Sequence, residues 1–218
     1  MSPSSVLGRG PLAKPAYPFI LAFGGLTLAF WLLNLSFPAS ICMLLTLFLL
    51  YFFRNPPRTA PADLNAIVSP ADGRVILVDE VLENEFLKSP ARRVAIFMNI
   101  FDVHVNRAPV AGRVIASRHR TGRFLAAFHE EAGRVNEQQA VLWETPQGLR
   151  VLTVQIAGLL ARRIVPAFGE GDVLAKGAPF GMICFGSRVD LYIPRSCDIL
   201  VKIGDRLRAG ESIVGRCS

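Results

Sequence analysis

The dipeptide Gly186-Ser187 interrupts a run that otherwise has the composition of a β-strand, GMICFGSRVD (residues 181–190). A glycine inside such a run usually marks a β-bulge or a tight turn, which is the simplest interpretation. The pair could also do chemistry, because glycine leaves its carbonyl carbon unhindered and serine carries a hydroxyl nucleophile. In that second interpretation, the peptide bond between the two residues is the reactive group.

A serine nucleophile needs a base, and the chain offers three histidines. His104 follows an apolar, strand-like run and precedes Pro109, a strand-end position suited to an active site. We expect His119, in the basic segment SRHR, on an exposed face, and His129, in FHEE, in a surface ion pair. An ordinary structural role is the commoner outcome for any single histidine, so a role for His104 needs support from other residues.

Asp72, in the segment SPADG, is a candidate for the carboxylate that orients a histidine base. An ordinary Asp-Gly turn is the simpler interpretation of this segment. Ser187, His104 and Asp72 together make a hydrolase triad one possibility. The G-x-S-x-G segment of many serine hydrolases is missing, however, because CFGSRVD has no second glycine at the required place.

The N-terminal segment is apolar and indicates contact with a membrane, since no charged residue occurs from 17 to 53. Two apolar runs, 18–33 and 37–53, predict a helical hairpin over residues 1–53, with both ends in the cytoplasm because basic residues flank it on each side. A cleaved signal peptide is the alternative, but its apolar region would be short and single. The net charge of +7 suits nucleic acid or an anionic membrane, and the apolar segment favours the membrane.

The rest of the chain divides into a Pro-rich linker, residues 54–64, and a body, residues 65–218. Strand-like runs occupy residues 73–81, 92–101, 112–120, 140–158 and 188–194. TPQG (145–148) predicts a hairpin turn, and 158–168 could form a short helix. Residues 201–217 have the turn-punctuated pattern of lipoyl-type domains. The predicted fold class is mainly β (α+β): a lipoyl-like β-sandwich or barrel with an N-terminal apolar helical hairpin.

The four cysteines, Cys42, Cys184, Cys197 and Cys217, form no CxxC pair and have no metal-ligand spacing. We therefore expect no metal site and no disulfide framework. Free thiols in a reducing compartment are the default expectation for such a pattern.

Four segments together resemble the successive motifs of phosphatidylserine decarboxylase proenzymes of the short bacterial and archaeal type. They are SPADG (69–73), FMNIFDVHVNRAP (97–109), QIAGLLARRI (155–164) and KGAPFGMICFGSRVDLYIP (176–194). The resemblance covers about residues 50–218 with the motifs in the same order, and the N-terminal hairpin also resembles that type.

The resemblance implies self-cleavage between Gly186 and Ser187. The Ser187 hydroxyl would attack the Gly186 carbonyl to give an ester, β-elimination would break that ester, and residue 187 would become a pyruvoyl group. The cofactor would thus be covalent and derived from Ser187, and the products would be a large chain (1–186) and a small chain (187–218). The pyruvoyl group would form a Schiff base with the amino group of phosphatidylserine and accept the electrons released as CO₂ leaves, giving phosphatidylethanolamine.

The implied partners are an anionic phospholipid substrate and the cytoplasmic face of the cell membrane, with no nucleic acid. The sequence leaves the oligomeric state open, an oligomer included. One position departs from longer members of the family, which carry two histidines three residues apart. Here His104 matches the first and Arg107 stands at the second, a form that the short type shares. Either His104 serves both self-cleavage and decarboxylation with Asp72, or self-cleavage uses another group.

Two other functions stay open on the sequence. One is a pyruvoyl decarboxylase acting on a different phospholipid headgroup or on a free amino acid, and the hairpin disfavours the free amino acid. The other is a non-enzymatic, membrane-anchored module of the lipoyl type. That module would need a modified lysine at a hairpin tip, for which Lys176 and Lys202 are the candidates.

Overall fold

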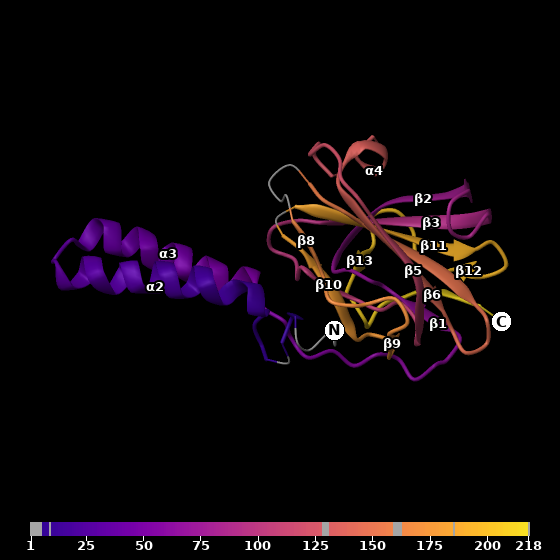
Figure 1. The fold of residues 1–218 in the computed structure, drawn as a ribbon, viewed down its shortest axis with the longest axis horizontal. Helices are drawn as coiled ribbons and strands as arrows, with labels where there is room; N and C mark the ends of the chain where they lie inside the picture. Colours follow the sequence, from indigo (N-terminus) through magenta and orange to yellow (C-terminus); the bar gives the residue numbers. More distant parts are fainter. Residues whose placement is uncertain (1–5, 9, 128–130, 159–162, 185, 218) are drawn as a thin grey trace.

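The computed structural model describes residues 6–8, 10–127, 131–158, 163–184 and 186–217 of the 218-residue chain. It shows an N-terminal helical hairpin that projects from a body of β-sheets (Figure 1). The predicted fold class, mainly β with an N-terminal pair of apolar helices, is confirmed.

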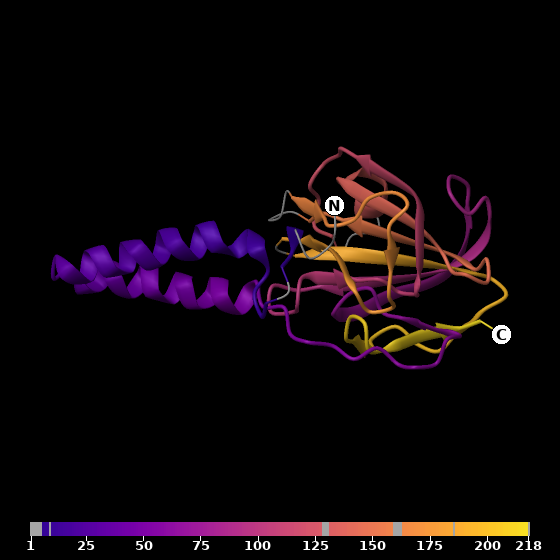
Figure 2. The same ribbon diagram turned by 60° about the horizontal axis from the view of Figure 1, so that its bottom comes forward.

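The hairpin consists of a short 3-10 helix, η1 (Lys14–Ala16), and two α-helices, α2 (Tyr17–Leu32) and α3 (Ser36–Phe52). The chain reverses at Asn34, whose φ of 56° lies in the left-handed region that asparagine adopts more readily than most residues. Figure 2 shows both helices extending side by side, away from the body. Most of their large apolar side chains are exposed, and the segment Lys14–Leu32 is long and apolar enough to cross a membrane by length and composition.

Three antiparallel sheets and one short helix, α4 (Ala132–Val135), make up the described body. The largest sheet has the strand order β13-β2-β3-β11-β7-β6-β5-β9. Its strands are β2 (Gly73–Glu83), β3 (Ser89–Met98), β5 (Gly112–Arg120), β6 (Gln138–Glu144), β7 (Arg150–Ile156), β9 (Val173–Leu174), β11 (Ser187–Pro194) and β13 (Arg206–Leu207). The second sheet joins β4 (Val105–Arg107), β10 (Pro179–Ile183) and β8 (Ile164–Pro166), and the third joins β1 (Ala66–Val68), β14 (Ile213–Arg216) and β12 (Asp198–Ile199).

The main core lies between the large sheet and the two small ones. Strand β11 shows the pattern that builds it, because the alternate residues Val189, Leu191 and Ile193 are all fully buried in this core. Across the core, Trp143 of β6 packs edge-on against Phe180 of β10, with ring centroids 5.2 Å apart. Apolar side chains therefore hold the β4-β10-β8 sheet against the large sheet.

The predicted strand runs correspond to β2, β3, β5, the β6–β7 pair and β11, and the predicted turn at residues 145–148 joins β6 to β7. The helix expected over 158–168 is wrong where the structure describes it. Ile164–Pro166 is strand β8, because its backbone pairs with the edge of β10. Residues 159–162 of that expectation lie outside the described residues.

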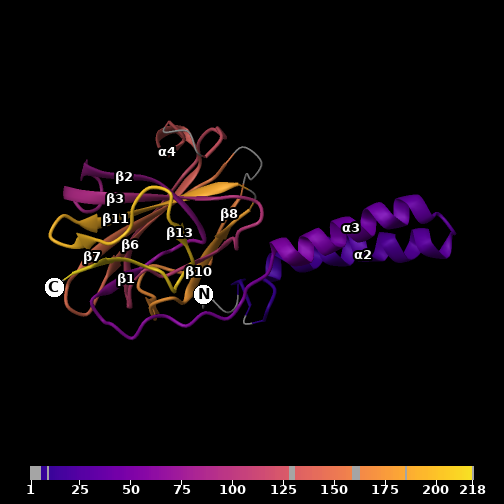
Figure 3. The ribbon, with the colours of Figure 1, turned by 180° about the vertical axis from the view of Figure 1, so that it is seen from behind.

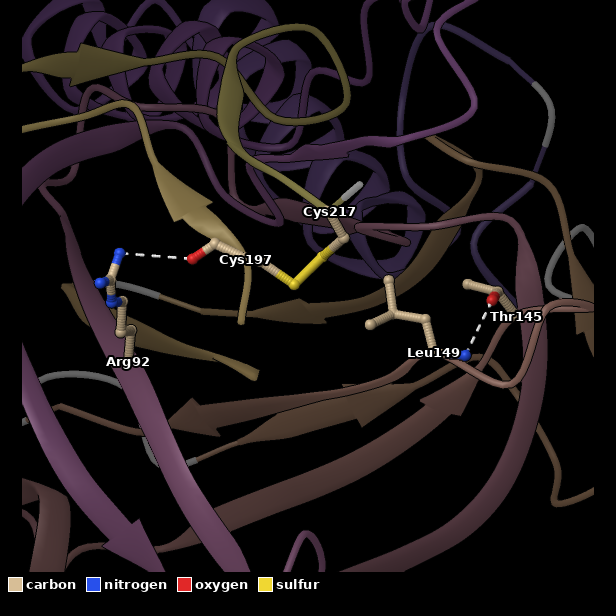
Figure 4. The surroundings of a disulfide bond; sticks show 5 residues. All are labelled: Arg92, Thr145, Leu149, Cys197 and Cys217. Atoms are coloured by element: carbon tan, nitrogen blue, oxygen red, sulfur yellow. Dashed lines mark hydrogen bonds between the residues drawn. A yellow bond between two sulfur atoms is a disulfide. The ribbon is translucent and has the colours of Figure 1, made fainter. Parts of the chain in front are cut away.

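The expectation of four free thiols is also wrong, because Cys197 and Cys217 form a disulfide. Figure 4 shows this bond, with the Arg92 guanidinium donating a hydrogen bond to the Cys197 carbonyl oxygen at 3.3 Å. The pairing of β12 with β14 brings the turn after β11 next to the C-terminal segment, a contact that cysteine spacing cannot reveal. Cys42 and Cys184 are free, as expected.

Candidate active site

Three neighbouring strands of the large sheet bring the predicted site residues to one end of that sheet. Strand β2 begins at Gly73, directly after Asp72, and its residue Arg74 pairs with Phe97 near the end of β3. The last residue of β3, Met98, pairs with Ser187, the first residue of β11. The start of β2, the end of β3 and the start of β11 therefore meet, although their residues are far apart in the sequence.

The Gly186-Ser187 bond lies where the chain passes from one sheet to another. Strand β10 ends at Ile183 in the small sheet, and β11 begins at Ser187 in the large one, so the interrupted strand of the sequence is two strands. Gly186 has a φ of +63°, a conformation that glycine adopts without strain. Its carbonyl oxygen packs against Gly158, where an added Cβ would come within 1.7 Å of it. A turn and a closely packed carbonyl thus occur together at this bond.

Ser187 is fully buried, and in the part of the chain that the structure describes its hydroxyl has only a weak partner. The Oγ atom donates to the Met98 sulfur at 3.5 Å, and thioether sulfur is a poor acceptor. The hydroxyl is therefore not engaged by a strong acceptor that would hold it away from a neighbouring carbonyl carbon.

His104 lies beside the same crossing. Its backbone oxygen accepts a hydrogen bond from the Ile183 amide at 3.3 Å, which ties it to the end of β10. Its Nδ1 lies 2.9 Å from the Asp102 carbonyl oxygen, and because that oxygen can only accept, Nδ1 carries the hydrogen. The other ring nitrogen, Nε2, is buried without a hydrogen-bond partner among the described residues. The ring therefore presents an unpaired nitrogen acceptor inside the protein.

Burial keeps this histidine neutral. It lowers the pKa of His104 to about 4, with a smaller contribution from the positive charge of Arg54, while the hydrogen bond to Asp102 acts in the opposite direction. An imidazole with a free Nε2 at neutral pH has the form that a general base requires.

The helical hairpin supplies part of the cover over His104. The Phe52 ring, at the end of α3, packs on the imidazole with ring centroids 4.2 Å apart. Phe52 belongs to an apolar cluster that also includes Val103, Val105 and Met182 of the body. Figure 3 shows the base of the hairpin meeting the body beside β8 and β10. The predicted membrane element and the candidate base are thus in direct contact.

A basic residue fixes the loop that carries His104. The Arg54 guanidinium donates to the Phe101 carbonyl oxygen at 2.6 Å, and the Tyr51 hydroxyl donates to the same oxygen at 3.2 Å. Both come from the end of the hairpin, and the side chain of Phe101 itself is 61% exposed. An aromatic side chain is thus exposed at the base of the hairpin, next to the candidate site.

Asp72 has other partners in the structure. Its carboxylate accepts from Arg58 at 2.8 Å and from the Ala209 amide at 2.7 Å, and Arg58 also pairs with Glu211. Burial raises the pKa of Asp72 above its usual range, against the lowering effect of these partners. The hydrogen bonds of Asp72 and His104 do not include each other, so their pairing stays a prediction.

Arg107, three residues after His104, has a structural role. Its guanidinium donates to the Gly177 carbonyl oxygen at 3.0 Å and to Asn55 Oδ1 at 2.8 Å. A further bond goes to the carbonyl oxygen of Pro56. Arg107 therefore fastens the segment that follows the hairpin to the body.

The remaining candidates lie elsewhere. His119 is exposed, as expected, and its Nε2 lies 3.1 Å from Glu137. His129 lies outside the described residues. The Lys176 ammonium donates to the backbone oxygens of Asp63 and Ala66, so it is bound to the body rather than free at a hairpin tip. Among the described residues, no group of three or more His, Cys, Asp and Glu is arranged to hold a metal ion.

Sequence reasoning missed three residues near the site: Phe52, Asn106 and Gln155. Phe52 is one of many aromatic residues in the apolar run, and its contact with His104 depends on how the hairpin joins the body. Asn106 and Gln155 are fully buried polar residues within the strands β4 and β7. In the sequence, the only sign of a role for Asn106 and Gln155 was a polar side chain within a strand-like motif.

Comparisons with known proteins agree with this arrangement. The family model described as phosphatidylserine decarboxylase matches residues 45–215. The chain is 47% identical over 205 residues to the phosphatidylserine decarboxylase proenzymes of Syntrophus aciditrophicus and Syntrophotalea carbinolica, and 43% identical to that of Geotalea uraniireducens. Each alignment covers 94% of this chain and 96% of the relative. The chain therefore belongs to the phosphatidylserine decarboxylase family.

Proposed function

We propose that this chain is a proenzyme that cleaves itself between Gly186 and Ser187 and then decarboxylates phosphatidylserine to phosphatidylethanolamine. The observation that carries the proposal is the surroundings of this one peptide bond. Among the described residues, a positive-φ glycine precedes a buried serine with no strong hydrogen-bond acceptor, and a neutral histidine with an unpaired Nε2 is attached to the same crossing. Family membership over most of the chain supports the same reaction.

In the cleavage step, Ser187 Oγ attacks the Gly186 carbonyl carbon and transfers its proton to a base. We assign that base to His104 Nε2, with Nδ1 held by the Asp102 carbonyl. The peptide C–N bond breaks, the serine nitrogen takes up a proton, and the carbonyl is left as an ester on Oγ. Loss of the Cα proton of residue 187 then expels the Gly186 carboxylate. The remaining dehydroalanine gains water and releases ammonia, which leaves a pyruvoyl group at position 187.

The site fits such a group, because residue 187 is fully buried and two buried amide side chains lie on the same side of the core. When formed, the group supplies a ketone that can bind the substrate amino group and take up the electron pair released with CO₂. This chain's own residues position it: β11 holds residue 187 against β3, and a hydrogen bond from the Asn99 amide to the Asp102 carboxylate shapes the loop that leads from β3 to His104.

We assign Asp72 to the site as a positioning residue. Its carboxylate binds Arg58 of the segment after the hairpin and the Ala209 amide, and these contacts hold the start of β2 beside β3.

We further propose that the protein binds the cytoplasmic face of the membrane through the hairpin. One apolar helix of sufficient length, the exposed apolar surface of both helices and the position of Phe52 over His104 support this location. A lipid headgroup at the membrane surface would then lie near the candidate site. Deleting residues 1–53 should release much of the protein from membranes, and a truncated body that stays bound in high salt would contradict the proposal.

The test of the proposed function compares Ser187→Ala with the wild-type chain in membranes. The wild-type chain should split into two chains, and it should release CO₂ from carboxyl-labelled phosphatidylserine but not from free serine. The Ser187→Ala variant should stay uncleaved and inactive. The control is Ser196→Ala, which changes an exposed serine nearby and should be cleaved and active like the wild-type chain. Because Cys197 and Cys217 both follow Ser187, the two chains should separate on a gel without reductant. Cleavage in Ser187→Ala would overturn the proposal.

A further inference from the structure

Two amide side chains are sunk into the main core where apolar residues would be expected. Asn106 of β4 and Gln155 of β7 are both fully buried. Gln155 Nε2 donates to Asn106 Oδ1 at 2.7 Å, and Asn106 Nδ2 lies 3.6 Å from the Met98 sulfur. Gln155 Oε1 has no partner among the described residues. A buried polar atom without a partner destabilises the fold, so this oxygen calls for an explanation.

The orientation of both amides follows from their partners. Sulfur in Met98 can only accept, so Asn106 presents its NH₂ group to that sulfur and its oxygen to Gln155. Gln155 must then use its NH₂ group toward Asn106, which leaves its oxygen as the free atom. The unpartnered group is therefore an acceptor, and it calls for an N–H or O–H donor.

The pair lies on the side of the sheet that Ser187 faces. Gln155 pairs in register with Val189, which is two residues after Ser187, so all three side chains project to the same face. Met98 pairs with Ser187 and contacts both the Ser187 hydroxyl and the Asn106 amide. A continuous series of contacts thus runs from Ser187 through Met98 and Asn106 to Gln155.

The backbone makes room for the Gln155 amide at this place. A Cβ added to Gly181 of β10 would lie 2.9 Å from Gln155 Nε2 and 3.2 Å from the Val165 backbone oxygen. The amide therefore packs directly over a glycine, in a space that any larger residue would close.

We propose that Gln155 is a binding residue for the amino group of the substrate, with its free Oε1 accepting an N–H of the phospholipid headgroup and Asn106 holding the amide in place. This inference rests on the proposed function. An amino group suits this position because it carries the N–H donor that Gln155 Oε1 lacks. In the proposed function, the amino group of the headgroup must also come to residue 187 to react. The inference explains why an acceptor is kept unpaired in an apolar core, at a cost to stability.

The test replaces Gln155 with methionine, which has similar length and volume but no acceptor of comparable strength. The full-length variant should self-cleave as the wild-type chain does. Its melting temperature should change little, since the unpaired Gln155 oxygen is removed while Asn106 Oδ1 loses its donor. Its kcat/KM for phosphatidylserine should fall about tenfold or more, which is the effect of losing one hydrogen bond to a group that is charged or becomes charged during the reaction. The amount of substrate trapped on the small chain by borohydride reduction should fall in parallel.

The matched control is Gln139→Met. Gln139 is the same residue type, is also buried, and pairs in register with Gln155, but it lies one strand farther from β11. It should retain wild-type kcat/KM. If Gln155→Met folds poorly, Asn106→Leu tests the same idea, because it frees the Gln155 amide from its anchor and should also lower kcat/KM and trapping per folded molecule.

Several results would overturn the inference. They are a Gln155→Met enzyme with wild-type turnover and trapping, equal losses in Gln155→Met and Gln139→Met, or a loss that only follows the fraction of folded protein. A wild-type chain that neither splits nor releases CO₂ would instead contradict the proposed function, so the two failures are distinguishable.

Discussion

Replacing Phe52 with alanine should raise the pKa of His104, because it removes the ring with which the hairpin covers the imidazole. The centroids of the two rings are 4.2 Å apart. Burial is the main reason that the pKa of His104 lies at about 4. The hydrogen bond from Nδ1 to the Asp102 carbonyl favours protonation and comes from the body, so it should persist in the variant.

The size of the effect follows from these contacts. The pKa of His104 is lowered from 6.5 to about 4, which corresponds to about 3 kcal/mol in favour of the neutral ring. Phe52 covers one face of the imidazole, so we assign it somewhat less than half of this preference. We therefore expect the Phe52→Ala variant to have a His104 pKa of about 5.

The assay is the pH dependence of the self-cleavage rate, whose acidic limb reports protonation of the base in the uncleaved chain. As pH falls, the wild-type cleavage rate should hold until His104 protonates near pH 4, and the limb of Phe52→Ala should lie about one pH unit higher. An NMR titration of the three histidines in uncleaved Ser187→Ala protein gives the same pKa without turnover. Phe48→Ala, one helical turn earlier and with its ring 6.0 Å from Phe52, is the control for lost hairpin packing. An unchanged pKa in Phe52→Ala, or an equal rise in Phe48→Ala, would refute the reasoning.

Three further predictions concern the residues around this histidine. Asp72→Asn should lower the melting temperature, because it weakens a partly buried ion pair with Arg58. It should slow self-cleavage only modestly, since the Asp102 carbonyl already orients His104. A complete block of cleavage in folded protein would contradict this and show that Asp72 acts on the base directly. Arg107→Lys should lower the free energy of unfolding by about 2–3 kcal/mol, because the ammonium cannot reach the partners of the guanidinium, while cleavage per folded molecule stays at the wild-type rate. The free energy of unfolding should rise between about pH 4 and pH 6.5, because the unfolded chain binds a proton on His104 that the folded chain does not, and denaturant titrations of His104→Gln should show a flatter rise over the same range.

Much of the fold could be predicted from local patterns, because those patterns reflect local physics. The alternating apolar residues of β11 and the turn at residues 145–148 have periodicities and turn residues that point to one structure. The uncharged run from 17 to 53 predicts two apolar helices for the same reason. The helix expected over 158–168 failed because Ile164–Pro166 pairs with β10, and tertiary pairing overrides a weak local preference.

The site was predictable only in part. Gly186, Ser187 and His104 could be proposed because they stand in recognisable motifs. The structure places His104 at the crossing that carries the other two, and their chemical roles stay predictions. The partners of Asp72 could not be predicted, because Arg58 reaches it from the segment after the hairpin. The Cys197–Cys217 bond likewise depends on how β12 and β14 pair. Contacts between distant segments are invisible to spacing arguments.

The most direct test of the central claim is the intact mass of the small chain, residues 187–218, isolated from the wild-type protein after its disulfide has been reduced with a thiol. A pyruvoyl group at position 187 makes this chain lighter by about 17 Da, the mass of the ammonia lost, than a chain that begins with serine. Its ketone should also react with hydroxylamine to form one oxime, with the corresponding increase in mass. A chain that begins with an unmodified serine, or a protein that is never cut at Gly186-Ser187, would contradict the account.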